Sequence, residues 1–112
     1  MVSKAQVEEL WEKRKSLSDS EIGREKQHAA GKLTARERIE LLADPGSFHE
    51  IDAFMESFPP KFGKLKGKTT LRQGVITGAA QIQGRSVYLY AQDFTVEAGS
   101  LGEREARKTA RV

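Results

Sequence analysis

Residues 74–92 read GVITGAAQIQGRSVYLYAQ, and this stretch decides the fold. Two apolar runs are separated by Gly84. In the second run, Val87, Leu89 and Ala91 alternate with two tyrosines. A two-residue period on both sides of a glycine is typical of a β-hairpin. The first run is predicted to place Ile76, Ala80 and Ile82 on one face.

Three helices are predicted upstream, each from a serine or threonine followed three residues later by Glu or Gln. Ser3 and Gln6 open the first, over about residues 4–16, whose apolar face carries Val7, Leu10 and Trp11. Ser18 and Glu21 open the second, which Gly31 ends. Because all three predicted helices are only weakly amphipathic, we expect them to be arms that pack on something larger, with Trp11 docked on a neighbouring domain or subunit.

Thr34 and Glu37 open the third predicted helix, and Pro45-Gly46 ends it. Its apolar stripe is Ala35, Ile39, Leu42 and Ala43. Beyond it, residues 48–54 are compatible with a short strand, and residues from Gly102 onward are helix-forming without a stop signal.

Residues 61–72, KFGKLKGKTTLR, are basic and contain no acidic residue. They can be a solvated loop or a contact for a polyanion. Since only Phe62 interleaves with the lysines and no nucleic-acid motif is present, a nucleic-acid partner is not expected.

Composition excludes several classes of function. The 112 residues contain no cysteine, so disulfides, Cys-ligated zinc and Cys nucleophiles are ruled out. No run of 18 apolar residues and no apolar leader is present, which predicts no membrane partner and a cytoplasmic location. His28 and His49 are too far apart for metal-ligand spacing, so no metal is expected. Asp93 and Glu97 could form an acid–base pair, but exposed carboxylates near a turn are the simpler interpretation.

Residues 91–102, AQDFTVEAGSLG, join the hairpin to the last predicted helix. Small residues at a helix N-terminus leave backbone N–H groups accessible, and such groups attract anions or polarise carbonyl oxygens. The alternative is that these glycines only form a turn and a helix cap.

Two long blocks carry a resemblance to a known family. REKQHAAGKLTARERIELLADPGSFHEID at 24–52 and GVITGAAQIQGRSVYLYAQDFTVEAGSLGE at 74–103 resemble the N-terminal part of biotin-dependent acyl-CoA carboxyltransferases, the β subunits of propionyl-CoA and acetyl-CoA carboxylases. The resemblance implies an α+β chain of the ClpP/crotonase type. Residues 1–46 would form a helical arm, and residues 47–112 would start the carboxyltransferase N-terminal domain with its first ββα unit, truncated.

The resemblance also implies a reaction, the movement of a carboxyl group from carboxybiotin to a short-chain acyl-CoA. Biotin would be carried by a partner and not bound directly by this chain. Expected partners are the remaining carboxyltransferase domain or subunit, biotin carboxylase with the biotin carrier protein, and further copies in a homo-oligomer. No catalytic side chain is expected, because backbone N–H groups stabilise the enolate. The alternative function is a non-catalytic interaction or assembly module that docks on a full-length acyl-CoA carboxylase.

Carried onto this sequence, the family's CoA-binding groove falls on Phe94, Thr95, Val96, Gly99, Ser100 and Gly102. Lys64 and Lys66 are added on electrostatic grounds as contacts for CoA phosphates. Ala98 and the residues 70–73 depart from the family pattern, which has a glycine and a Pro-Gly-Asp-like turn there. The family's oxyanion turn and biotin-binding domain come later in its sequences, so this chain alone is expected to be inactive.

Overall fold

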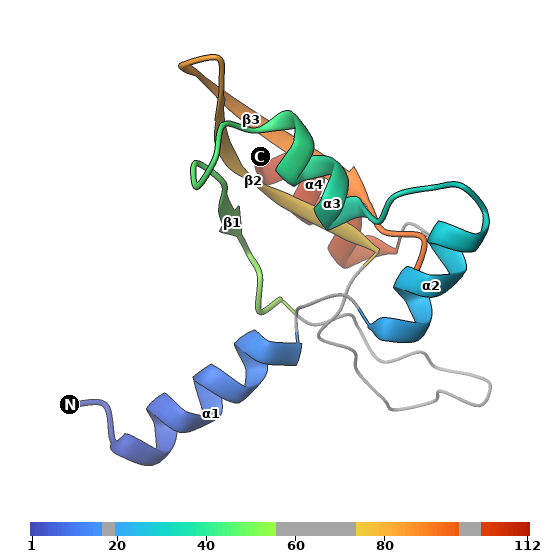
Figure 1. Cartoon of the computed structure of the whole chain (residues 1–112). Coiled ribbons are helices and arrows are strands. Elements are labelled where there is room, and N and C mark those ends of the chain that lie inside the picture. The colour runs from blue at the N-terminus through green and yellow to red at the C-terminus, as the bar shows by residue number, and fades with distance from the viewer. Residues whose placement is uncertain (17–19, 56–73, 97–101) are drawn as a thin grey trace.

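The computed structural model describes residues 1–16, 20–55, 74–96 and 102–112. The elements follow the order α1 (Lys4–Ser16), α2 (Glu21–Ala29), α3 (Ala35–Leu42), β1 (His49–Ile51), β2 (Val75–Ile82), β3 (Arg85–Gln92) and α4 (Glu103–Arg111). A small sheet with α3 on one face and α4 on the other forms the body of the molecule, and α1 extends away from it (Figure 1).

The sheet is antiparallel, with β2 between β1 and β3. The predicted hairpin is confirmed, with Val75 opposite Gln92 and Ile82 opposite Arg85. Gln83 and Gly84 form its turn with φ values of 50° and 78°, as a two-residue hairpin turn requires. Asp44, which follows α3, accepts the backbone N–H groups of both turn residues at 2.8 Å and 2.8 Å. The end of α3 is therefore tied to the tip of the hairpin.

The face of β2 that meets α3 is apolar. Ala35 and Ile39 of α3 pack with Ile76, and Phe48, Leu89 and Ala91 lie against this cluster. A glycine at position 78 makes room for the Phe48 ring, because a Cβ there would lie 2.5 Å from Phe48 Cε2 and 2.5 Å from His49 O.

One member of the predicted α3 stripe is wrong. Leu42 is 56% exposed, whereas Ala35, Ile39 and Ala43 are buried. The buried positions follow an i, i+4, i+8 spacing, so Leu42 falls at the margin of the stripe.

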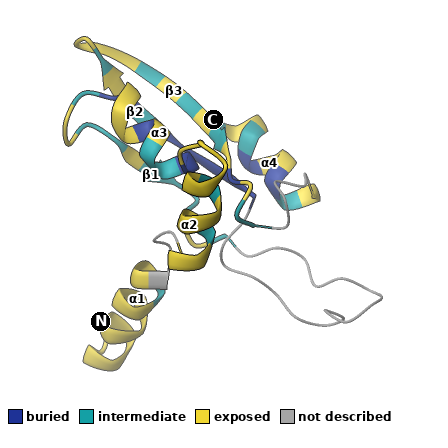
Figure 2. Ribbon diagram, turned by 45° about the vertical axis from the view of Figure 1, so that its right-hand side comes forward, coloured by how far each residue is buried: buried dark blue, intermediate teal, exposed yellow. Residues whose placement is uncertain are grey.

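The opposite face of β2 meets α4, and polar groups are buried there. Val75 and Thr77 are almost fully covered, and much of β2 is coloured as buried in Figure 2. Thr77 Oγ1 donates to Ile51 O at 2.9 Å, and Lys108 Nζ donates to Val75 O at 3.0 Å. Both faces of β2 are thus covered near its N-terminal end.

Two of the three predicted N-terminal helix caps are confirmed. Ser3 and Gln6 exchange reciprocal hydrogen bonds of 2.9 Å and 3.2 Å, and Thr34 and Glu37 form a complete capping box. The cap assigned to Ser18 is wrong, since α2 starts after Ser20, whose Oγ accepts the Gly23 N–H at 3.1 Å. Ser20 is followed three residues later by Gly23 instead of Glu or Gln, so it caps α2 with its hydroxyl alone and gives no capping-box pattern.

Gly31 ends α2 with a φ of 72°, as predicted. The basic segment 61–72 lies outside the described residues. The predicted division of the chain at residue 46 stays a prediction, and α3, on its N-terminal side, packs on the sheet. Of the helices in the described ranges, none is both long enough and apolar enough to cross a membrane.

Candidate functional site

The turn that leaves β3 is held by the buried carboxylate of Asp93. Asp93 Oδ1 accepts the Thr95 N–H at 2.9 Å and the Thr95 hydroxyl at 2.5 Å. The backbone N–H of Asp93 donates to Gly74 O at 2.9 Å, and Val96 N donates to Asp93 O at 3.2 Å. These bonds fix residues 93–96 in one conformation at the end of the hairpin.

The expectation that Asp93 is an exposed carboxylate is wrong, because the residue is 3% exposed. Its side chain folds back onto the backbone two residues ahead, as Asp does in many turns. The spacing of Asp93 and Thr95 was the sequence signal for this arrangement. Glu97, the other member of the predicted pair, lies outside the described residues.

Phe94, Thr95 and Val96 lie in this one turn. Phe94 is 59% exposed, and Thr95 and Val96 are half-buried. Thr95 packs against α2, where a Cβ on Gly23 would lie 2.9 Å from Thr95 Cβ. The helix α2 therefore supports the turn from one side while Phe94 faces solvent.

The remaining predicted contacts divide into two groups. Gly102 is exposed and forms the N-cap of α4 without a side-chain hydrogen bond. Gly99, Ser100, Lys64 and Lys66 lie outside the described residues.

Two carboxylates already occupy the N-terminal turn of α4. Glu103 and Glu105 both belong to this turn, and a Cβ on Gly102 would lie 2.7 Å from Glu105 Oε2. Negative side chains are favourable at a helix N-terminus, but they repel a second anion. The described part of the turn hence suits an apolar or neutral portion of a ligand better than a phosphate.

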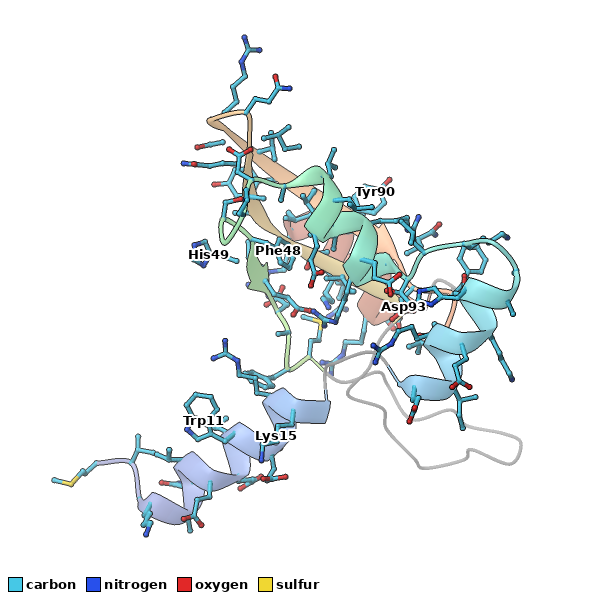
Figure 3. All side chains as sticks on the ribbon, viewed as in Figure 1. Trp11, Lys15, Phe48, His49, Tyr90 and Asp93 are labelled. Atoms are coloured by element: carbon cyan, nitrogen blue, oxygen red, sulfur yellow. The ribbon has the colours of Figure 1, made fainter. Side chains whose placement is uncertain are left out.

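Exposed aromatic side chains lead along β3 toward this turn. Tyr88 and Tyr90 are exposed, and they project from the face of β3 opposite to Leu89 (Tyr90 is labelled in Figure 3). Tyr88, Tyr90 and Phe94 therefore place three exposed aromatic rings along β3 and the turn that follows it, away from the Gln83-Gly84 turn.

Beneath α4 lies a group of charges that the sequence reasoning missed. Lys108 is 3% exposed, and burial lowers the pKa of its ammonium group, while the carboxylates of Glu50 and Asp52 oppose this shift. Asp52 adopts a φ of 57°, and its Oδ2 lies 3.4 Å from Arg111 Nη1. The sequence of α4 has no apolar periodicity. The spacing of Glu105 and Lys108 at i and i+3, which puts them on one side of the helix, was the remaining signal for a buried side.

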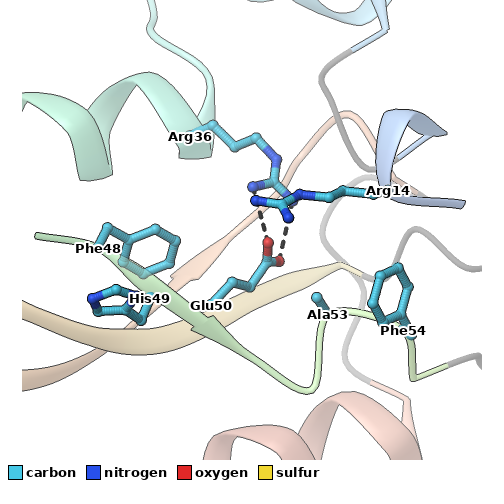
Figure 4. A pocket seen from close by; sticks show the side chains of 7 residues that line it. All are labelled: Arg14, Arg36, Phe48, His49, Glu50, Ala53 and Phe54. Atoms are coloured by element: carbon cyan, nitrogen blue, oxygen red, sulfur yellow. Dashed lines mark hydrogen bonds and ion pairs between the residues drawn. The ribbon is translucent and has the colours of Figure 1, made fainter. Parts of the chain in front are cut away.

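A depression of about 560 Å³ lies where α1 approaches α3 and β1 (Figure 4). Its lining is Arg14, Arg36, Phe48, His49, Glu50, Ala53 and Phe54. Arg36 donates two hydrogen bonds of 3.1 Å to the Glu50 carboxylate, which neutralises its charge. The guanidinium of Arg14 lies 5.5 Å from the centre of the Trp11 ring.

The two histidines lie in different elements. His28 Nε2 lies 2.9 Å from each oxygen of the Glu37 carboxylate and so links α2 to α3. His49 lies in β1. Within the ranges that the structure describes, no three His, Cys, Asp or Glu side chains gather as a metal site would require.

Comparison with known proteins identifies the class. Residues 26–112 match the family described as the carboxyl transferase domain, and the chain belongs to this family. It is 53% identical over 88 residues to the methylmalonyl-CoA decarboxylase subunit alpha of Veillonella parvula. It is 50% identical over 88 residues to the propionyl-CoA carboxylase beta chain of Cereibacter sphaeroides. Each alignment covers 79% of this chain and 17% of the relative.

Solved structures give the same assignment. The transcarboxylase 12S structure, described as a hexamer assembly with methylmalonyl-coenzyme A and methylmalonic acid bound, superposes with a TM-score of 0.85 at 41% identity. The match covers 99% of this chain and 22% of that one. A single-chain, multi-domain long-chain acyl-CoA carboxylase superposes with a TM-score of 0.83 at 28% identity, covering 99% and 13%. The resemblance and the crotonase-like α+β fold predicted from the sequence are confirmed, and the chain spans about a fifth of these relatives or less.

Proposed function

We propose that this chain supplies an acyl-CoA-contacting part of a carboxyltransferase that moves a carboxyl group from carboxybiotin to a short-chain acyl-CoA. The observation that carries the proposal is the family match, which runs through the hairpin, the turn after it and α4. The bound methylmalonyl-coenzyme A of the transcarboxylase 12S structure, which superposes on 99% of this chain, supports it.

In this proposal, the turn at 93–96 forms one wall of the groove. Phe94 offers an exposed ring, and Val96 a half-buried aliphatic group, to the methyl and methylene groups of the uncharged pantetheine arm of CoA. Thr95 contributes shape, because Asp93 already engages its hydroxyl. Gly99, Ser100 and Gly102 continue the wall, and Lys64 and Lys66 contact the CoA phosphates.

Biotin arrives on a partner in this proposal, and it supplies the carboxyl group that is transferred. The chain works with the remaining carboxyltransferase domain or subunit, with biotin carboxylase and the biotin carrier protein, and in a homo-oligomer. The buried Asp93 acts as a positioning residue for the turn, since both of its hydrogen bonds to Thr95 hold the wall in place.

The test is binding of propionyl-CoA to the 112-residue chain, followed by calorimetry and by backbone NMR shifts. We expect shifts at 93–96, and we expect Phe94→Ala to weaken binding about fivefold, the effect of losing about 1 kcal/mol of apolar contact. Phe54→Ala removes a ring of similar exposure outside the turn and should leave the affinity unchanged. Equal affinities for the wild type and Phe94→Ala would contradict the proposed contact.

A non-catalytic docking module is the second candidate, favoured by the exposed apolar side chains on α1. It predicts binding to a complete acyl-CoA carboxylase with an affinity that acyl-CoA does not alter. The first candidate predicts that acyl-CoA changes this affinity, because both partners would share the ligand.

A further inference from the structure

Helix α1 lies almost entirely in water. Among its side chains at positions 4–15 all are exposed except that of Lys13, which is half-buried (Figure 2). A helix of 13 residues is marginally stable in water unless one face packs against something. The capping box of Ser3 and Gln6 fixes its first turn but buries no apolar surface.

The exposed side of α1 carries a short apolar stripe, formed by Val7, Leu10 and Trp11 at i, i+3 and i+4. Trp11 is 57% exposed, and the Arg14 guanidinium stacks over its ring. An indole ring is costly to hydrate and is enriched at protein interfaces. The stripe therefore has the composition of an uncovered contact surface.

The charges of α1 change sign along the helix. After Lys4, which opens the helix, Glu8, Glu9 and Glu12 precede Lys13, Arg14 and Lys15. Two such helices side by side in the same direction place like charges together, whereas two antiparallel helices place acidic residues beside basic ones. The charge pattern is thus complementary to itself under a two-fold axis.

The intrahelical ion pairs of α1 do not oppose this arrangement. Lys13 lies 3.0 Å from Glu9, and Lys15 lies 3.1 Å from Glu12. Exposed pairs of this kind contribute little stability, so they can exchange partners when a second helix arrives.

We infer that two copies of this chain pair through α1 in antiparallel orientation. Leu10 and Trp11 pack across the two-fold axis against the same residues of the second copy. Glu8 and Lys15 flank the stripe on the same side of the helix, so Glu8 then lies beside Lys15 of the partner subunit. The interface is separate from the turn at 93–96 and does not depend on the proposed function.

The first test is the oligomeric state of the 112-residue chain, measured by sedimentation over a wide concentration range. Trp11 is the single tryptophan, so its fluorescence reports this surface alone. We expect a dimer whose dilution shifts the emission to the red. Trp11→Ala and Leu10→Glu should each raise the dissociation constant about tenfold or more. Leu41→Ala, an exposed leucine on α3, is the matched control and should leave it unchanged.

The second test is the orientation of the helices. The chain has no native cysteine, so engineered cysteines form the only disulfides. Antiparallel pairing predicts that Val7→Cys mixed with Arg14→Cys forms a cross-link, because the two Cα atoms approach within disulfide range. Val7→Cys alone should remain reduced.

Three outcomes would overturn the inference. The first is a monomer at every concentration, with Trp11 emission independent of dilution; a different protein or a further segment would then cover the stripe. The second is a Trp11→Ala chain that associates as tightly as the wild type. The third is efficient self-cross-linking of Val7→Cys, which requires parallel helices. Circular dichroism of each variant shows whether α1 remains helical, so loss of the helix is recognised separately.

Discussion

The two faces of β2 are covered by helices of opposite character. On the α3 side, Ile39 and Ile76 pack in an apolar cluster. On the α4 side, Thr77 and Lys108 are buried, and Lys108 reaches across to donate a hydrogen bond to the Val75 carbonyl of β2. The α3 contact depends on the volume of its side chains, and the α4 contact depends on which polar groups find partners.

This difference has an energetic meaning. The stability that an apolar contact contributes falls when side-chain atoms are removed from it, and it is largely insensitive to pH. A buried ammonium group is stable only while its hydrogen bonds and the surrounding carboxylates offset its loss of hydration. The α4 side of the sheet should therefore respond to pH, whereas the α3 side should respond to side-chain size.

The largest effect is expected on the α3 side. Ile39→Ala removes three carbon atoms from a residue that is 3% exposed, and it should lower the free energy of unfolding by about 2 to 5 kcal/mol. Urea denaturation followed by circular dichroism measures this change. Leu42→Ala, on the same helix but exposed, should change it by about 0.5 kcal/mol or less.

The next effect concerns the backbone on the α3 side. Gly78→Ala places a Cβ against the His49 carbonyl. That carbonyl cannot shift without disturbing the pairing of β1 with β2, so the substitution should lower the free energy of unfolding by about 1 to 3 kcal/mol. Gly102→Ala meets only the carboxylate end of Glu105, which can rotate, so its cost should be smaller. Thermal unfolding compares the two, and an equal loss of stability would show that the Phe48 packing is not as close as described.

On the α4 side, Lys108→Met should alter how stability depends on pH. The folded-state pKa of Lys108 is lowered from 10.5, so the unfolded chain binds the proton more tightly. The penalty is therefore present at low pH and is relieved as pH rises through the folded pKa toward 10.5. The wild type should gain stability relative to Lys108→Met over that window, measured by urea denaturation at a series of pH values. A difference that stays constant with pH would mean that Lys108 remains well hydrated.

The smallest effect is expected from the exposed pair that links α2 to α3. The hydrogen bond from His28 is the main cause that lowers the pKa of Glu37, and the Thr34 N–H adds to it. The stability that this carboxylate contributes is fully present above pH 4.5, and it is lost as the pH falls through the lower pKa of the folded state. Glu37→Gln keeps the cap acceptor and should flatten only this acid limb. Glu40→Gln, exposed on the same helix, is the control, and an identical curve for both variants would argue against the His28 contact.

The sequence predicted those parts of the fold whose signals are local. The hairpin follows from alternation around Gly84, and the start of α3 follows from Thr34 and Glu37. The cap of α2 was misplaced because Ser18 with Glu21 matches the capping-box pattern, whereas the observed cap, Ser20, is followed three residues later by Gly23. Leu42 was misplaced because a helix pattern defines a face but not its margin.

The sequence was sufficient to predict a turn at the candidate site, but not which polar side chains are buried in and near it. Phe94 and Thr95 lie together, as their adjacency requires. The burial of Asp93 and Lys108 depends on partners distant in sequence, Gly74 and Val75 among them, and no apolar period announces a buried charge. Tertiary contacts, rather than local propensity, decide such positions.

Asp44 ties the turn of the hairpin to the end of α3. Its carboxylate accepts the N–H groups of Gln83 and Gly84, which lie 39 and 40 residues farther along the chain. A shift of pairing by one residue would turn Ile76 and Ala80 from the apolar side to the polar side of the sheet. Since only one register presents both turn amides to this carboxylate, a single side chain at the end of α3 selects the alignment of the strands, and formation of the hairpin becomes coupled to the docking of α3.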